Sequence, residues 1–213
     1  MHKVDLLVFD LDGTLTRSAD DLAASVNHTL RTLGLPVLTP DAVRGFIGDG
    51  VKVLVKKALG PAQEHYDRAM ELFSAYYGEH LLDRTTLYPD VIETLDHFDR
   101  KSKVIVTNKL YRFTIRITTA LGIAGRFREI IGEDSTPFKK PDPQLLRLVM
   151  SKWGAAPERT VMIGDGVNDI LLAQQAGALG CAFLNGITER EKLLALSPDL
   201  TCEKLSDLKT LIC

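Results

Sequence analysis

The chain has 213 residues, of which 45% are hydrophobic and 25% are charged, and this composition is typical of a globular protein. Its length allows either one large domain or a medium-sized domain that carries a smaller domain. The formal net charge of −2, and the lack of any apolar segment near the roughly 20 residues of a membrane span, argue against nucleic-acid and membrane partners. Three cysteines without CxxC spacing, and no signal-peptide pattern, predict a reduced, cytoplasmic protein without structural disulfides.

The predicted elements begin with a short strand that ends in acidic residues. Residues 6–9 form an apolar run, typical of a strand buried on both faces of a parallel sheet. Asp10 and Asp12 follow it, and Gly13 allows a sharp turn. Two carboxylates this close repel each other and commonly share a cation or a proton. Alone, the pattern fits an acidic surface turn equally well.

Residues 17–84 are predicted to be helical, with no convincing strand. Helices are expected over about 18–33, from Thr39 onward, over 51–59 and over 60–77. A glycine-flanked loop over 46–50 joins the second helix to the third. The aromatic side chains over 66–77 are expected to pack in the core of this helical segment.

From residue 89 onward, strands and helices alternate. Strands are predicted over 103–107, 129–132, 160–163 and 179–184, with helices over 90–98, 112–121, 142–153 and 168–176. The residues beyond these give weak signals for both. The alternation predicts an α/β fold, a doubly wound parallel sheet. Because the first strand belongs to the same sheet, we divide the chain into a core of residues 1–16 and 85–213 and an inserted helical domain of residues 17–84.

Polar side chains follow the predicted strands at the carboxyl edge of the sheet, where open parallel sheets bind ligands. Besides the first acid pair, these are Thr107, Asn108 and Lys109 after the second strand, Asp134, Ser135, Thr136, Lys139 and Lys140 after the third, and Asp165, Asn168 and Asp169 after the fourth. Carboxylates suit Mg²⁺, and hydroxyl and ammonium groups suit phosphate oxygens. The set favours magnesium-assisted phosphoryl transfer, with Asp10 as nucleophile and Asp12 as general acid and then base.

The sequence resembles the haloacid dehalogenase superfamily in its phosphatase branch. Residues 10–15, DLDGTL, match the DxDGT motif, and Thr107 matches the second motif. Lys140 within KKPDP matches the lysine motif, and residues 164–169 match GDxxxD. The resemblance covers essentially the whole chain. It implies a Rossmann-like core with a helical cap of the C1 type inserted after the first motif.

The resemblance also implies a role for each motif residue. Asp10 would form an aspartyl-phosphate, while Asp12 would protonate the leaving oxygen, activate water and lend its backbone carbonyl to Mg²⁺. The remaining roles are metal ligation by Asp10, Asp12 and Asp165, orientation of the metal site by Asp169, and binding of phosphoryl oxygens by Thr107, Asn108 and Lys140. Mg²⁺ is the expected cofactor, and a small phosphorylated metabolite is the expected partner of a monomer or homodimer.

Three segments are similar to phosphoglycolate phosphatases: TNK at 107–109, DSTPFKKPDP at 134–143 and IGDG at 47–50. Leu110 departs from that pattern, because those enzymes commonly continue TNK with proline. We therefore expect hydrolysis of 2-phosphoglycolate. The alternatives are a phosphatase for pyrophosphate or sugar phosphates, a phosphomutase, or a non-catalytic signalling module phosphorylated on Asp10.

Substrate specificity is expected to come from the cap. The loop carrying Gly48 and Gly50 could approach the substrate tail with its backbone. Arg44 and Lys52 flank this loop, and either could pair with a substrate carboxylate. For each of them, a charge on a solvated helix face is the favoured interpretation.

Overall fold

Six parallel strands form the central sheet of the computed structural model, which describes residues 1–213. In spatial order they are β5 (Glu129–Ile131), β4 (Ser102–Val106), β1 (Leu6–Phe9), β6 (Thr160–Gly164), β7 (Leu179–Phe183) and β8 (Leu200–Cys202). Five of them lie where the sequence predicts strands. The sixth, β8, lies in the segment of weak signals, because an edge strand of three residues is too short to show periodicity.

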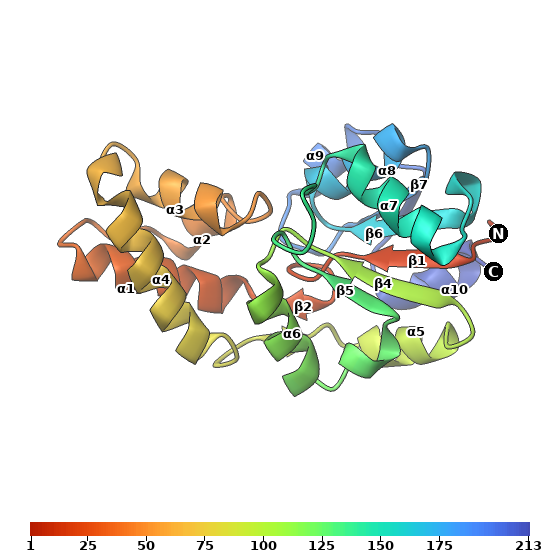
Figure 1. Cartoon of the computed structure of the whole chain (residues 1–213), viewed down its shortest axis with the longest axis horizontal. Helices are drawn as coiled ribbons and strands as arrows, with labels where there is room; N and C mark the ends of the chain where they lie inside the picture. The colour runs from red at the N-terminus through yellow and green to blue at the C-terminus, as the bar shows by residue number, and fades with distance from the viewer.

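Helices cover both faces of this sheet (Figure 1). One face carries α7 (Pro143–Trp153), α8 (Val167–Ala176) and α9 (Arg190–Leu194), and the other carries α5 (Val91–His97), α6 (Tyr111–Ala120) and α10 (Leu208–Leu211). The alternation of side chains along β1 serves both layers: Leu6 and Val8 pack in one hydrophobic cluster, and Leu7 and Phe9 in the other. The α/β fold with a doubly wound parallel sheet is thereby confirmed.

The helical segment lies beside the sheet as a separate group (Figure 1). It consists of α1 (Ala19–Thr32), α2 (Pro40–Arg44), α3 (Val51–Leu59), a 3-10 turn (Gln63–His65) and α4 (Tyr66–His80). The helix predicted over 60–77 is wrong at both ends. Gly60, with φ of 54°, ends α3, and the 3-10 turn delays α4 to Tyr66, from where it continues past Tyr77. Further 3-10 turns lie at Ala124–Arg126, Pro157–Arg159 and Leu205–Asp207.

The two chain passages between the helical group and the sheet run side by side. Here β2 (Thr16–Arg17) pairs antiparallel with β3 (Thr86–Leu87), so the expectation of no strand within residues 17–84 is wrong at Arg17. Asp21 of α1 is buried and accepts hydrogen bonds from the backbone N–H groups of Arg84 and Thr85 and from Thr85 Oγ1, at 2.7 to 3.1 Å. The proposed domain limits stay a prediction, and both fall within this junction.

The ends of the chain lie together, away from the helical group (Figure 1). His2 N–H donates to Leu211 O at 2.9 Å, and Cys213 N–H donates to His2 O at 2.9 Å. None of the helices combines the length and the apolar character that crossing a lipid bilayer requires.

Candidate active site

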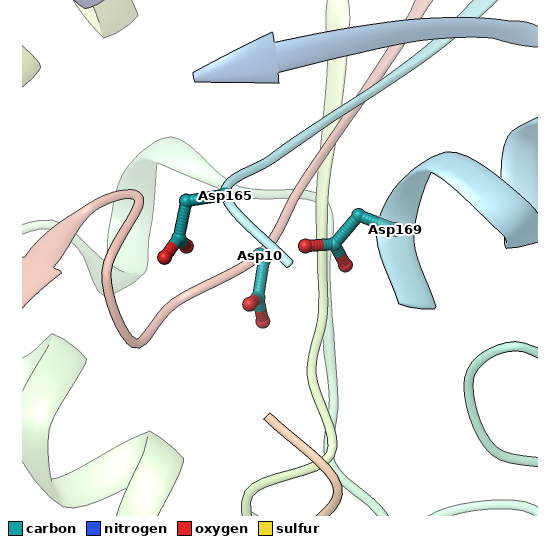
Figure 2. Close-up of side chains that lie close together, drawn as sticks. All are labelled: Asp10, Asp165 and Asp169. Carbon is teal, nitrogen blue, oxygen red and sulfur yellow. The ribbon is translucent and has the colours of Figure 1, made fainter. Parts of the chain in front are cut away.

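Three buried aspartates converge at the carboxyl edge of the sheet. Asp10 follows β1, Asp165 follows β6, and Asp169 lies in the first turn of α8. Each offers a carboxylate oxygen, and these oxygens lie within 4.8 Å of one another. Figure 2 shows the three side chains close together, with Asp10 between Asp165 and Asp169. The register explains the arrangement, because Phe9 aligns with Ile163 and the residues that follow leave the sheet together.

The protein holds Asp165 and Asp169 in fixed positions. Asp165 accepts from Thr14 Oγ1 at 2.7 Å and from Ile187 N–H at 2.8 Å. Asp169 accepts from Gly166 N–H at 2.9 Å. Burial, together with the charges of Asp10 and Asp169, raises the pKa of Asp165 to about 8. Burial also raises the pKa of Asp169 to about 6, although the Lys140 ammonium opposes the shift.

Lys140 is the cation of this acidic cluster. Its Nζ lies 2.6 Å from Asp169 Oδ1 and 2.8 Å from Asp10 Oδ1, and its side chain is only 3% exposed. Burial acts to lower the pKa of Lys140, but the Asp10 and Asp169 carboxylates outweigh it, so the pKa is raised. The contact with Asp10 is an ion pair without hydrogen-bond alignment, and Asp10 Oδ1 has no hydrogen-bond donor in the protein.

Two glycines in the motifs make room for these carboxylates. A Cβ at Gly164 would lie 2.1 Å from Asp169 Oδ2, and a Cβ at Gly13 would lie 2.1 Å from Asp165 Oδ2. Gly13 also has a φ of 88°, which favours glycine. The glycines of DxDGT and GDxxxD are therefore explained by contacts within the site.

Asp12 is not part of the cluster, because its side chain is paired elsewhere. Both of its carboxylate oxygens accept from Lys109 Nζ, at 2.8 and 2.7 Å, and Oδ1 also accepts from Ser18 Oγ. Burial acts to lower the pKa of Lys109, but the Asp12 charge and Tyr77 outweigh it, and the net shift is upward. The two acids of the opening motif thus have different electrostatic environments, which suits different chemical roles.

The predicted phosphate ligands after β4 lie at the same edge. Thr107 and Asn108 are buried, and both line a cavity that also contains Asp10 and Asp12. The Asn108 side chain already bonds to the backbone: Nδ2 donates to Gly48 O at 3.0 Å and to Lys140 O at 3.1 Å, and Oδ1 accepts from Lys140 N–H at 3.1 Å. A contact between this amide and phosphate would have to replace one of these bonds.

This cavity, of about 50 Å³, lies between the helical group and the sheet. Its remaining walls are formed by Leu22, Ile47, Gly48, Gly50, Val51, Leu54, Phe73, Tyr77, Lys109, Leu110 and Phe113. Gly48 and Gly50 thus line the cavity, and their contact with a substrate stays a prediction. Arg44 and Lys52 do not line this cavity: Arg44 pairs with Asp20 at 2.9 Å and Asp41 at 3.6 Å, and Lys52 is exposed. Their role in specificity stays a prediction.

Three further residues of the site, Thr14, Lys109 and Tyr77, were given no role by the sequence, although Lys109 was expected at this edge of the sheet. Thr14 lies within the DxDGT motif and Lys109 lies two residues after Thr107 of the second motif, so their positions in the sequence already indicated the site. The position of Tyr77 offered no such indication, because an aromatic residue on the inner face of α4 has the same spacing whether it packs in a core or lines a cavity.

The sequence matches the model of the haloacid dehalogenase-like hydrolase family over residues 7–183. The chain belongs to this family and is a hydrolase. It is similar over nearly its whole length to phosphatases. The phosphoglycolate phosphatase of Vibrio parahaemolyticus is 34% identical over 215 residues, which cover 96% of this chain and 94% of the relative. Phosphoglycolate phosphatase 1 of Pseudomonas aeruginosa is 37% identical over 213 residues, which cover 95% of this chain and 78% of the relative.

Solved structures agree with this assignment. A predicted phosphoglycolate phosphatase from Haemophilus somnus superposes with a TM-score of 0.93 at 32% identity and covers 99% of both chains. A phosphoglycolate phosphatase-like structure from Lactobacillus delbrueckii, at 22% identity, has a TM-score of 0.90 over 98% of both chains. At that identity the second comparison concerns the fold alone.

Proposed function

We propose that the protein is a Mg²⁺-dependent phosphatase that hydrolyses a small phosphate monoester, 2-phosphoglycolate in particular, through an aspartyl-phosphate on Asp10. The observation that carries the proposal is the separation of the two motif acids. Asp10 lies in the carboxylate cluster beside Lys140, whereas Asp12 lies outside it beside Lys109. Of the two, only Asp10 can approach a phosphorus atom held between Lys140 and the acidic cluster.

In the first step, an Asp10 carboxylate oxygen attacks phosphorus and the bond from phosphorus to the ester oxygen breaks. Asp12 gives its proton to that oxygen, and the alcohol leaves. Lys140 and the Thr107 hydroxyl stabilise the phosphoryl oxygens. In the second step, Asp12 takes a proton from water, whose oxygen attacks phosphorus, and the bond to Asp10 breaks to release phosphate.

The residues at the cluster fit a magnesium ion. Asp10 and Asp165 would hold it with carboxylate oxygens, Asp12 with its backbone carbonyl, and Asp169 would keep Lys140 and the cluster oriented. Three buried carboxylates with a single lysine among them leave negative charge without a partner, and Asp10 Oδ1 lacks a hydrogen-bond donor. When bound, the ion neutralises charge on the phosphoryl oxygens and on the attacking carboxylate.

A small substrate with a short tail suits the cavity. A space of about 50 Å³ admits only a few water molecules, and apolar side chains form its wall on the helical group. This wall would exclude bulk water while the aspartyl-phosphate forms. Both curated relatives described above carry the name phosphoglycolate phosphatase, which supports a two-carbon substrate.

The test is steady-state hydrolysis of a panel of phosphate compounds by the purified protein with Mg²⁺. The panel contains 2-phosphoglycolate, 3-phosphoglycerate, glucose 6-phosphate, β-glucose 1-phosphate and pyrophosphate. We expect the highest kcat/KM for 2-phosphoglycolate and no turnover in EDTA. Preference for pyrophosphate or a sugar phosphate would replace the substrate assignment. Isomerisation of a sugar phosphate without phosphate release would indicate a mutase, and a stable phospho-protein without turnover would indicate a signalling module.

A further inference from the structure

Tyr77 carries a buried hydroxyl that has no hydrogen-bond partner in the protein. The residue is 1% exposed, lies on α4 and lines the cavity above Asp10 and Asp12. Its ring is fixed by Phe73, with ring centroids 5.5 Å apart, and by an edge-to-face contact with Phe113 at 5.1 Å. Phenylalanine would fill the same space without leaving a polar group unpaired. A buried donor without a partner costs free energy, so a ligand at this position is indicated.

Lys109 supplies a second donor next to this hydroxyl. It is the only cationic side chain that lines the cavity, and its Nζ lies 4.9 Å from the centroid of the Tyr77 ring. An ammonium group has three N–H donors, and two of them go to the oxygens of Asp12. One donor therefore remains for a ligand.

The other polar groups of the cavity are already assigned. Asp10 and Thr107 mark the phosphoryl end, and the Asn108 amide bonds to Gly48 and Lys140. The rest of the wall is apolar apart from the two glycines. Among the side chains of the cavity wall, hydrogen-bond donors for a charged group on the substrate tail are then left at Tyr77 and Lys109.

We propose that Tyr77 Oη and Lys109 Nζ form a subsite that binds the carboxylate of the substrate and so selects phosphorylated carboxylic acids over neutral phosphate esters. The subsite rests on the proposed function in one respect, the placement of the phosphoryl group at Asp10. Burial raises the pKa of Tyr77 to about 12, partly offset by the Lys109 charge, so its hydroxyl keeps its proton at neutral pH. The selecting residues are then Tyr77 and Lys109, whereas the sequence indicates Arg44 and Lys52.

The test compares two non-hydrolysable ligands by calorimetric titration of the magnesium-loaded protein. 3-Phosphonopropionate has the shape of phosphoglycolate with a methylene group in place of the ester oxygen, and 3-hydroxypropylphosphonate is its neutral-tailed counterpart. The wild type should bind the carboxylate more tightly. Tyr77→Phe should reduce that preference, the ratio of the two dissociation constants, by about tenfold, as expected for one hydrogen bond to a charged group.

Tyr76→Phe is the matched control. Tyr76 lies next to Tyr77 on α4 but does not line the cavity, and its ring stacks between His28 and His80. The preference should be unchanged in this variant. Thermal unfolding adds a second readout: because the Tyr77 hydroxyl has no protein partner, Tyr77→Phe should not lower the Tm.

Three results would overturn the subsite: no preference in the wild type, the same preference in Tyr77→Phe, or a large loss of Tm in Tyr77→Phe. Failure of the proposed function has a different signature. If 2-phosphoglycolate is bound through its carboxylate but not hydrolysed, the titration still supports the subsite while the substrate assignment fails.

Discussion

Asn108 and Lys140 are joined by a reciprocal pair of hydrogen bonds across 32 residues of sequence. Lys140 N–H donates to Asn108 Oδ1, and Asn108 Nδ2 donates to Lys140 O, both at 3.1 Å. The same Nδ2 also reaches Gly48 O in the helical group. The amide therefore positions the lysine backbone, and with it the ammonium beside Asp10, and links both to the loop over the cavity.

Replacement of Asn108 by alanine should consequently affect Lys140. Three hydrogen bonds are lost, two of them with buried backbone groups of Lys140, and we expect a loss of about 2 kcal/mol in the free energy of unfolding. The kcat should fall as well, because Lys140 Nζ is no longer held at Asp10. Urea unfolding and steady-state kinetics on the same preparation measure the two effects. A normal kcat in a destabilised variant would show that Lys140 is positioned without Asn108.

Asp10→Asn should abolish turnover. The amide is a poor nucleophile of nearly the same size, and we expect kcat to fall by at least about 1,000-fold. Phosphate release under saturating substrate measures it. Lys140 loses its ion pair with Asp10 but keeps its ion pair with Asp169, and asparagine has nearly the size of aspartate, so a normal circular-dichroism spectrum is the control for the fold. Activity within tenfold of the wild type would refute Asp10 as nucleophile.

The metal-free protein should become less stable as pH rises. The pKa of Asp165 is raised to about 8 in the folded protein, above its ordinary value of 3.8, so the folded state holds this proton more tightly than the unfolded state. The free energy of unfolding therefore falls as pH rises between those two values. Above about pH 8 the whole contribution of this bound proton to stability is lost. Thermal unfolding in EDTA from pH 5 to 9 measures the trend.

The control for this trend is Asp165→Asn, which removes the titrating group and should flatten the profile. Mg²⁺ should raise the Tm of the wild type most at high pH, where the carboxylates are ionised. An equal slope in both proteins would show that other groups dominate the pH dependence.

Asp21→Ala should loosen the junction between the helical group and the sheet. The substitution removes the acceptor for two backbone N–H groups and one hydroxyl, which are then left without partners, and we expect a loss of about 3 kcal/mol. Asp20→Ala is the matched control, because the neighbouring Asp20 is exposed and pairs only with Arg44, and its loss should stay below about 1 kcal/mol. Urea unfolding measures the free energy of unfolding of both variants. Similar losses would contradict the role of Asp21.

The sequence could predict the motif residues because parallel strands end at one edge. Once the strands are assigned correctly, the prediction that their following residues lie close together needs nothing more. This holds for Asp10, Thr107, Asp165 and Asp169. The hydrogen-bond partners of the Asn108 side chain were beyond prediction. Nothing in TNK indicates that Asn108 bonds to backbone, since that depends on where the loop containing Lys140 passes.

The helical group shows a second limit. The spacing of apolar residues gives the inner face of a helix but not what that face meets. Tyr77 and Phe73 follow the same helical spacing of apolar residues, and both lie on the cavity wall. Only Tyr77 carries a polar atom, a hydroxyl that needs a hydrogen-bond partner. For the same reason the sequence directed attention to Arg44 and Lys52, whose charges are conspicuous in the sequence but lie outside the cavity.

Gly50 gives the most direct test of how the loop over the cavity is held. Its φ is 89°, and a Cβ there would lie 2.7 Å from Glu133 Oε2 and 3.1 Å from Asn108 O. Glu133 cannot easily move aside, since its side chain is 10% exposed and pairs with Lys139 at 3.2 Å. Gly50→Ala should therefore displace the loop from the sheet, and we expect KM to rise by about tenfold or more, with a loss of about 1 to 2 kcal/mol from backbone strain.

Gly60→Ala separates these two effects. Gly60 has a φ of 54°, and a Cβ there would have no neighbouring atom within 4 Å, so the substitution carries the backbone strain without the clash. It lies at the end of α3, outside the cavity. Stability should fall in both variants, and KM should rise only in Gly50→Ala. Equal KM values in the two variants would mean that the contact of Gly50 with Glu133 does not control how closely the loop covers the substrate.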